Sequence, residues 1–192
     1  PQRVPADKLK RLSAQMAAAL PLIETCEDLS QLLGLEGEAA QRYFDGFGEL
    51  ILQQREAFAF TVRSRRPPLD NINALLSFAY TLLAHDCTAA LEGVGLYVGF
   101  LHRLRPGRRS LALDLMEELR PVFADRFVLS CVNQKRLTAK HLHKQENGAV
   151  LLTDEGRREF LSAWQTRKQE PITHPFLGEK LPWGLVPHVQ AL

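Results

Sequence analysis

Cysteine is scarce in this chain of 192 residues, which holds three and no Cys-x-x-Cys pair. The three are Cys26, Cys87 and Cys131. Isolated cysteines in odd number exclude a disulfide framework and a thiolate zinc site, and they favour a reducing, cytoplasmic environment. Long apolar runs are also lacking, because no stretch reaches the roughly 18 uninterrupted residues of a membrane span. We therefore expect no membrane.

Excess charge of one sign is small, since 24 Lys and Arg face 22 Asp and Glu for a net charge of +2. Overall charge therefore gives no case for nucleic acid, and the distribution of charge has to make it. Hydrophobic residues at 45% and charged residues at 24% are typical of globular chains and argue against disorder. The start, Pro-Gln-Arg-Val-Pro, has no initiator Met or signal peptide, so we expect a piece of a longer protein.

Helical periodicity dominates the order of residues, and strand signals are thin. The pattern predicts an all-α, irregularly packed domain over residues 1–192. Asp70, Ser110 and Thr153 are expected N-caps, and Pro121 is expected to interrupt its helix. The predicted helices are Asp7–Leu22, Cys26–Gly34, a helix from a Gly34–Gly37 joint to Leu50, Asp70–Gly93, Leu111–Leu119, Phe123–Lys144 and Thr153–Gln169. A Pro- and Gly-rich tail follows over residues 171–192, with a last helix that we expect to be cut short.

Basic residues concentrate in the middle of the chain. Residues 1–54 hold five Lys or Arg and eight Asp or Glu, whereas residues 55–110 hold eight Arg and four Asp or Glu. Prolines and charges predict two exposed loops, at about 58–69 and 99–109. Guanidinium groups bind phosphate oxygens in a bidentate way, so DNA binding and ordinary solvated charge both remain open. The loop arginines are Arg63, Arg65, Arg66, Arg103, Arg105, Arg108 and Arg109.

Asp114 and Glu117 lie three residues apart on a predicted helix, so both carboxylates project from one face. His102 lies on the loop that leads into this helix, and Glu36 is expected at another helix start. Carboxylates with one imidazole suit Mg²⁺ or Mn²⁺ better than zinc. The alternative is that all four residues are ordinary surface, loop or capping side chains.

A rival metal site, His141-x-His143, has few further ligands, and its lysine and arginine neighbours favour a solvated or phosphate-facing helix. The tryptophans, Trp164 and Trp183, are expected to pack rather than to stack on bases. The cysteines lack the neighbours of a catalytic nucleophile.

Several long motifs in series resemble the CRISPR-associated spacer-acquisition integrase and endonuclease, over nearly the whole chain. The resemblance is to the family's C-terminal helical catalytic domain alone, without its N-terminal β-rich domain. The motifs are Gly34-Leu35-Glu36-Gly37 with Tyr43-Phe44, Arg63-x-Arg65-Arg66-Pro67-Pro68 with Asn73 and Tyr80, Val98-Gly99-Phe100-Leu101-His102, and Ser110-Leu111-Ala112-Leu113-Asp114-Leu115-Met116-Glu117.

The resemblance implies a divalent-metal site of Glu36, His102 and Glu117 for Mg²⁺ or Mn²⁺, assisted by Asp114. It also implies that Arg63, Arg65, Arg66 and Asn73 hold DNA, with Tyr80 either assisting or packing in the core. The implied activity is metal-assisted phosphoryl transfer, in which the 3′-hydroxyl of a captured DNA fragment attacks a CRISPR repeat.

The implied partners are DNA, a small ferredoxin-like adaptation subunit and, in many members, an iron–sulfur exonuclease. The full-length protein is expected to be a homodimer. A second class of function stays open: a fragment that binds DNA or a partner without catalysis, because segments outside it are needed to order the metal site.

Overall fold

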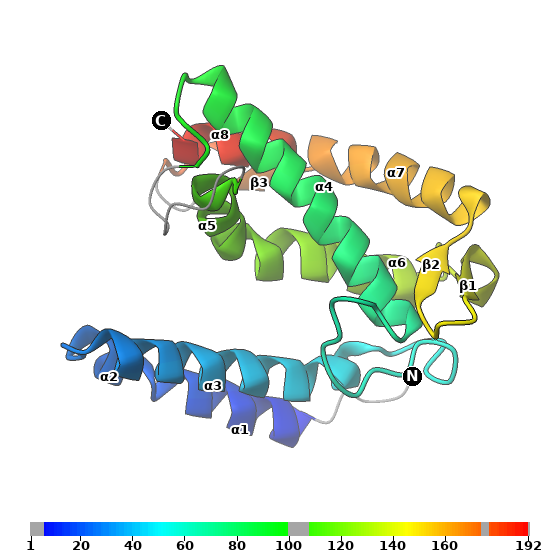
Figure 1. Ribbon diagram of the computed structural model, residues 1–192, viewed down its shortest axis with the longest axis horizontal. Coiled ribbons are helices and arrows are strands. Elements are labelled where there is room, and N and C mark those ends of the chain that lie inside the picture. The colour runs from blue at the N-terminus through cyan, green and yellow to red at the C-terminus, as the bar shows by residue number, and fades with distance from the viewer. Residues whose placement is uncertain (1–5, 100–107, 174–176, 192) are drawn as a thin grey trace.

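The computed structural model describes residues 6–99, 108–173 and 177–191. It confirms the all-α class, since helices dominate and the described strands form two short antiparallel pairs (Figure 1). The longer helices are α1 (Ala6–Ala17), α3 (Leu29–Phe47), α4 (Asn71–Gly93), α5 (Ser110–Leu119), α6 (Arg126–Asn133) and α7 (Asp154–Gln169). The shorter ones are α2 (Leu20–Glu24), α8 (Val186–Ala191), and the 3-10 turns η1 (Gly48–Leu50), η3 (Ala139–His141) and η4 (Trp183–Leu185).

The N-terminal helices differ from the prediction at two points. The expected helix Asp7–Leu22 is divided into α1 and α2, with Pro21 in the first turn of α2. The expected joint at Gly34–Gly37 is wrong, because α3 runs unbroken through it from its N-cap Asp28, whose carboxylate accepts the backbone N–H groups of Ser30 and Gln31. Glu36 therefore lies within a helix and not at a helix start.

Helix α4 is the centre of the core. Asp70 caps it as predicted, accepting the backbone N–H of Asn73 at 2.7 Å. The helix packs against α5, α8, α6 and the second strand, and it buries apolar residues on several sides. By length and composition α4 could cross a membrane, but half of its apolar window is buried inside the protein, as in core helices of soluble proteins.

Helix α5 ends at Leu119, as predicted, but the chain continues in a helical path past Pro121. Residues Arg120–Asp125 form a π-helical stretch, η2, that joins α5 directly to α6. A π turn shifts the hydrogen-bond register, which accommodates a proline whose nitrogen cannot donate. Ser110 is the first helical residue of α5 and not its cap, since Arg109 occupies that position without a side-chain hydrogen bond.

The predicted helix Phe123–Lys144 ends at Asn133 instead. After η3, strands β1 (Leu142–Lys144) and β2 (Val150–Leu152) pair around the turn at Asn147-Gly148, where Gly148 has a positive φ of 82°. Thr153 then caps α7, accepting the backbone N–H of Gly156 at 3.0 Å as predicted. Strands β3 (Pro171–Thr173) and β4 (Lys180–Pro182) form the second pair in the tail.

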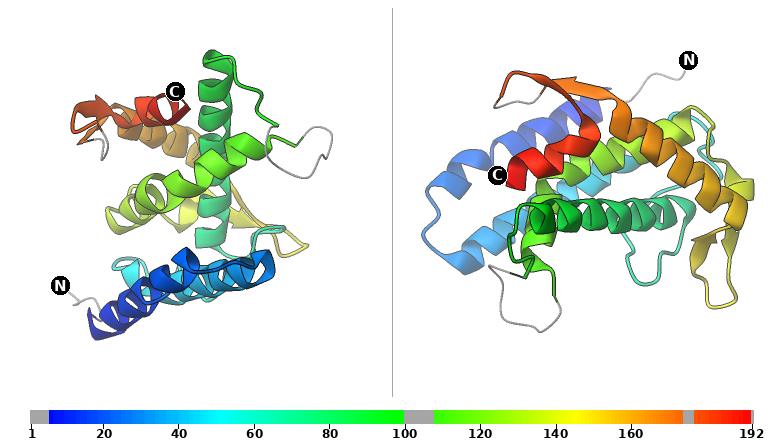
Figure 2. Two further views of the ribbon diagram at one scale, coloured as in Figure 1. Left: turned by 90° about the vertical axis from the view of Figure 1, so that its left-hand side faces the viewer. Right: turned by 90° about the horizontal axis from the view of Figure 1, so that it is seen from above.

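The first helices form a separate layer, which we call the arm (residues 6–47). Figures 1 and 2 show α1, α2 and α3 together below the remaining helices, which we call the body. Within the arm only Ala19, Gly46 and Phe47 are buried. The carboxyl end of α3 joins the body through an aromatic cluster of Tyr43, Phe44, Phe47 and Phe60. The rest of the arm is therefore held much more loosely than the body.

The body has its own aromatic core. Trp164 and Trp183 are both buried, which confirms that they pack. Their rings contact Phe123 from two sides, and Phe127 and Phe160 complete the cluster between α6 and α7.

Candidate active site

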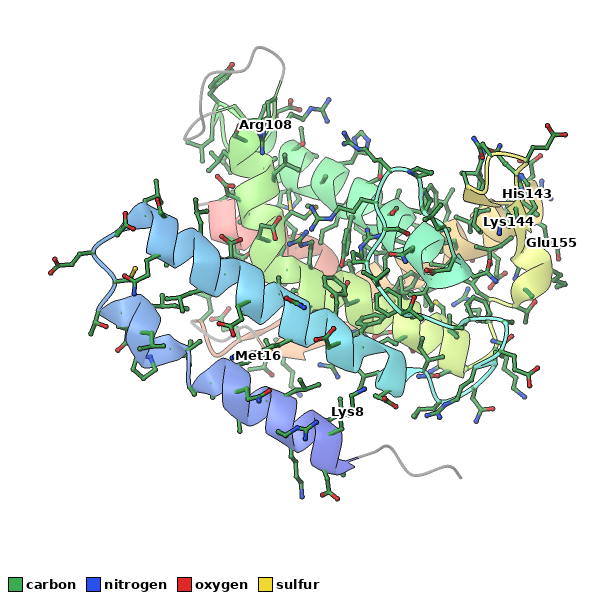
Figure 3. All side chains as sticks on the ribbon, turned by 60° about the horizontal axis from the view of Figure 1, so that its bottom comes forward. Lys8, Met16, Arg108, His143, Lys144 and Glu155 are labelled. Carbon is green, nitrogen blue, oxygen red and sulfur yellow. The ribbon has the colours of Figure 1, made fainter. Side chains whose placement is uncertain are left out.

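A pocket of about 470 Å³ lies between the arm and the body. The arm contributes Glu36 from α3 and apolar side chains that include Met16 of α1, labelled in Figure 3. The body contributes Glu117 from α5 and Arg120 from η2. The folded chain thus brings two of the predicted metal ligands, 81 positions apart in the sequence as numbered, to one cavity.

A buried carboxylate, Asp125, forms the floor of this pocket with an exposed fraction of 1%. It accepts the hydroxyl of Tyr43 at 2.7 Å and that of Tyr80 at 2.6 Å. Burial and the neighbouring Asp125 charge raise the pKa of both tyrosines, so both hydroxyls stay protonated and donate. Burial also raises the pKa of Asp125 itself, while the tyrosines and the nearby guanidiniums of Arg120 and Arg63 act in the opposite direction.

Two guanidiniums lie against the ring of Tyr80. The Arg120 group is 5.2 Å and the Arg63 group 5.3 Å from the ring centroid, within the range of cation–π attraction. Arg120 is also ion-paired with Glu117, one turn earlier on the same helical segment. Burial lowers the pKa of Arg120, the positive charge of Arg65 acts in the same direction, and Asp125 and Glu36 are among the groups that oppose this.

Asn73 is fully buried and holds the first basic loop in place. Its amide nitrogen donates to the carbonyl oxygen of Val62 at 2.8 Å and to Asp70. Its amide oxygen accepts from Arg63 at 2.7 Å and from the backbone N–H of Ser64 at 3.0 Å. With its hydrogen-bonding groups engaged in this way, Asn73 is built to position the loop, and direct contact with DNA stays a prediction.

The remaining predicted DNA-binding residues divide into two places. Arg65 and Arg66 are exposed on the loop before α4, and Arg108 and Arg109 are exposed just before α5. Because α4 has 23 residues, about 35 Å in length, the loops before and after it start from opposite ends of the core helix. Figure 3 shows Arg108 at the end of the molecule away from the hairpin residues His143 and Lys144.

Three predicted site residues, His102, Arg103 and Arg105, lie outside the described residues. Among the described residues on either side, the backbone N–H of Leu111 donates to the carbonyl oxygen of Val98 at 3.0 Å. Asp114 lies on α5, one turn before Glu117, and it interacts with another group of the protein.

Within the described ranges, 6–99, 108–173 and 177–191, no group of three or more His, Cys, Asp or Glu side chains is placed to hold a metal ion. The predicted ligands, the carboxylates of Glu36 and Glu117 with the imidazole of His102, nevertheless fit Mg²⁺ or Mn²⁺. These ions take carboxylate oxygens and leave positions open for water and phosphate. A cationic group already accompanies the carboxylates, because Arg120 pairs with Glu117.

In the rival His141-x-His143 motif, His141 has a structural role. His141 is buried and its Nδ1 accepts the backbone N–H of Thr138 at 3.1 Å, while its Nε2 lies 3.6 Å from Glu155. His141 therefore closes the turn before β1.

Comparison with known proteins identifies the family of this chain. The family model described as CRISPR associated protein Cas1 matches residues 2–166. The chain belongs to the Cas1 family. Among curated Cas1 relatives, the CRISPR-associated endonuclease Cas1 2 of Rhodospirillum rubrum is 60% identical over 169 residues, which cover 87% of this chain and 49% of that protein.

A second kind of Cas1 relative carries a further enzyme. The CRISPR-associated exonuclease Cas4/endonuclease Cas1 fusion of Geobacter sulfurreducens is 40% identical over 168 residues, covering 85% of this chain and 30% of the fusion. This chain spans about half the length of the first curated relatives that it matches, at 49%, 57% and 54%.

Solved structures show the same fold. A casposase bound to its integration product matches 96% of this chain and 53% of its own, with a TM-score of 0.78 and 27% identity. The partial Cas6-RT-Cas1–Cas2 complex matches 98% of this chain and 55% of its own, with a TM-score of 0.81 and 25% identity.

The sequence motifs missed the floor of the pocket. Asp125 gave no clear signal, because it stands beside Arg126 in a stretch of mixed polarity and its network is made with Tyr43 and Tyr80 of other helices. Arg120 follows Glu117 by three residues, a spacing that predicts contact on a helix. Tyr43 gave no signal beyond its place in a motif.

Proposed function

We propose that this chain provides the catalytic centre of a metal-dependent DNA integrase and endonuclease of CRISPR adaptation. The observation that carries the proposal is the meeting of Glu36 and Glu117 in one pocket flanked by arginines, in a chain of a family whose curated members are named endonucleases. The reaction is the joining of a captured DNA fragment, through its 3′-hydroxyl, to a CRISPR repeat.

In this mechanism Glu36, Glu117 and His102 hold one Mg²⁺ or Mn²⁺ ion, with Asp114 assisting. The ion, when bound, polarises the scissile phosphate and offsets the negative charge that develops on its oxygens. Arg63, fixed by Asn73 and Ser77, binds a phosphate at the pocket edge, and the exposed Arg65 and Arg66 bind neighbouring phosphates. Holding the strands in line lets a DNA hydroxyl attack without a protein nucleophile.

The second basic segment contributes to the same surface. Arg108 and Arg109 are exposed beside the start of α5, the helix that carries Glu117. With Arg103 and Arg105 they extend the phosphate contacts to the other end of α4.

The partners follow from the relatives. A solved neighbour is named a Cas1–Cas2 complex and a relative a Cas4/Cas1 fusion, which supports a Cas2 subunit and a Cas4 exonuclease as partners. The proposal extends to a ferredoxin-like Cas2, an iron–sulfur Cas4 and a cytoplasmic homodimer of the full-length protein, as the sequence resemblance implies. The second candidate, a binding domain without catalysis, is favoured by the exposed Arg65 and Arg66, which can hold DNA phosphates without a metal.

The test is cleavage of a labelled branched DNA, which needs no partner assembly. Product should form with Mn²⁺, disappear with chelator, and fall at least a hundredfold in Glu117→Ala while DNA affinity is kept. Cleavage by Glu117→Ala at the wild-type rate would overturn the site. DNA binding without cleavage by wild type in any condition would establish the non-catalytic candidate. The matched control is Glu118→Ala, one residue along and lying outside the pocket residues.

A further inference from the structure

The positively charged side chain of Arg120 lies in the pocket beside the carboxylate of Glu117. Its guanidinium is ion-paired with Glu117, and the Glu36 carboxylate is close enough to act on it electrostatically. Arg120 is therefore paired with one proposed metal ligand, Glu117, and lies within electrostatic reach of another, Glu36. A divalent ion that binds there has to displace this arginine from Glu117 or to bind beside its positive charge.

The ion pair between Arg120 and Glu117 can be broken at a small cost in free energy. The Glu117 side chain is 48% exposed and that of Arg120 22%, so water weakens their attraction, and ion pairs of this exposure contribute little. Arg120 also has a second partner in the ring of Tyr80, which Asp125 fixes through a hydrogen bond of 2.6 Å. After leaving Glu117, the guanidinium can remain in the pocket on this ring.

Charge favours one destination for the released group. Arg65 repels Arg120, which adds to the lowering of the Arg120 pKa by burial. Arg63 and Arg120 also repel each other, and the charge of Arg120 adds to the lowering of the Arg63 pKa by burial. When a divalent ion has taken the carboxylates, the local balance is positive, and an anion is needed to neutralise it. A phosphodiester of bound DNA has the charge and the oxygen geometry that a guanidinium prefers.

We propose that Arg120 is a resident cation of the active site, which competes with the divalent metal for Glu117 and transfers to a DNA phosphate once the metal is bound. This inference rests on the proposed function, because it assumes that Glu117 is a metal ligand. It makes metal binding and DNA binding cooperative through one side chain, since each ligand removes an obstacle to the other.

The first experiment measures Mn²⁺ binding to the full chain from the free-ion signal in electron paramagnetic resonance. Arg120→Gln should bind Mn²⁺ about three- to tenfold more tightly, because it removes both the competitor and its charge. Arg120→Lys keeps the charge and should stay within about twofold of wild type. Arg136→Gln, which removes an arginine that is paired with Glu159 and lies outside the pocket residues, is the matched control and should not change the affinity.

A Glu117→Gln variant separates the two hypotheses. If it loses Mn²⁺ binding while Arg120→Gln binds no more tightly than wild type, the inference about Arg120 is wrong and the metal site stands. If Glu117→Gln binds Mn²⁺ as wild type does, the metal site itself is wrong. Thermal unfolding of each variant shows whether a change in Mn²⁺ affinity comes from misfolding. If Arg120→Gln does not fold, Arg120→Lys still tests the inference, because it keeps the charge at this position.

The second experiment measures the affinity for a phosphorothioate-substituted branched DNA as salt is varied. With Mn²⁺, Arg120→Gln should lower the slope of log affinity against log salt by about one, the value for one lost phosphate contact. With chelator, its slope should equal that of wild type, because Arg120 then remains on Glu117. A loss of the same size in both conditions would show that Arg120 binds phosphate without any exchange.

Discussion

At the scale of single residues, the pocket is organised around a carboxylate that is not a predicted ligand. Asp125 is buried and holds two tyrosines from two helices, so it fixes the ring against which Arg63 and Arg120 lie. A buried network in which every member is paired specifies a single geometry. The precision of the site thus depends on a group that never has to touch DNA.

The charge state of Asp125 should be visible in stability. Burial raises its pKa, so the folded protein binds this proton more tightly than the unfolded chain, where the pKa is about 3.9. The resulting contribution to the free energy of unfolding is complete below the unfolded pKa and is lost as pH rises through the folded pKa. We expect the stability difference between wild type and Asp125→Asn to change in favour of the variant as pH rises from about 4 to 7.

Urea unfolding at several pH values checks this expectation. A difference that moves in favour of wild type with rising pH would contradict it. Asp154→Asn, at an exposed position at the start of α7, is the control for a general effect of charge and should show a much weaker dependence.

At the scale of elements, two glycines in helices have opposite environments. Gly34 lies within α3 with no atom within 4 Å of the place of a Cβ, whereas a Cβ on Gly156 would lie 2.2 Å from the carbonyl oxygen of His141. Gly34 therefore costs helix stability without a packing reason, and Gly156 permits the close approach of α7 to η3.

Alanine at these positions should change stability in opposite directions. Gly34→Ala is expected to stabilise the protein by about 0.5–1 kcal/mol, because alanine is the better helix former. Gly156→Ala should destabilise it by about 1–3 kcal/mol, because the backbone has to move. Chemical unfolding curves measure both changes in the free energy of unfolding. A stabilising Gly156→Ala would contradict the second prediction and would show that α7 shifts freely.

The same elements show what sequence could and could not predict. Capping by Asp70 and Thr153 is local chemistry, and both were predicted correctly. The Gly34–Gly37 joint was wrong because a glycine weakens a helix by only about 1 kcal/mol, which the cap at Asp28 and the rest of α3 overcome. Pro121 ends the α-helical hydrogen bonding after Leu119 as predicted, but the π-helical stretch that carries the chain on into α6 was not predicted, because it depends on packing around Phe123 and Ala124 rather than on local propensity.

Site prediction followed a similar division. Glu36 and Glu117 were proposed because they stand in long motifs, whereas Asp125 acts through hydrogen bonds to two distant tyrosines that no spacing reveals. The pairing of Arg120 with Glu117 follows from their spacing, but its contact with the Tyr80 ring does not. The roles of all predicted ligands and DNA contacts stay predictions.

At the scale of the whole molecule, the pocket lies between two parts of unequal stability. The arm buries few residues and the body contains the aromatic core. Local opening free energies follow the density of buried contacts. Amides of α1 and the first turns of α3 should therefore exchange with deuterium about tenfold or more faster than those of α4.

Hydrogen exchange with mass spectrometry measures this contrast. Saturating Mn²⁺ should slow exchange in α3 in the wild type, because a ligand that binds only the closed arrangement stabilises it. The effect should be absent in Glu117→Gln. Equal exchange in the arm and α4 without metal would contradict the division into two parts.

The division into arm and body also affects the metal affinity, because the proposed metal ligands come from both parts. When Glu36 and Glu117 belong to parts that separate transiently, the measured affinity for a cation is the intrinsic affinity multiplied by the fraction of molecules in which the parts are together. Phe47 of α3, whose ring centroid lies 5.2 Å from that of Phe60 and which lies outside the pocket residues, helps to set that fraction. Residues remote from the chemistry can therefore tune the metal concentration at which the protein becomes active, with the coordinating groups unchanged.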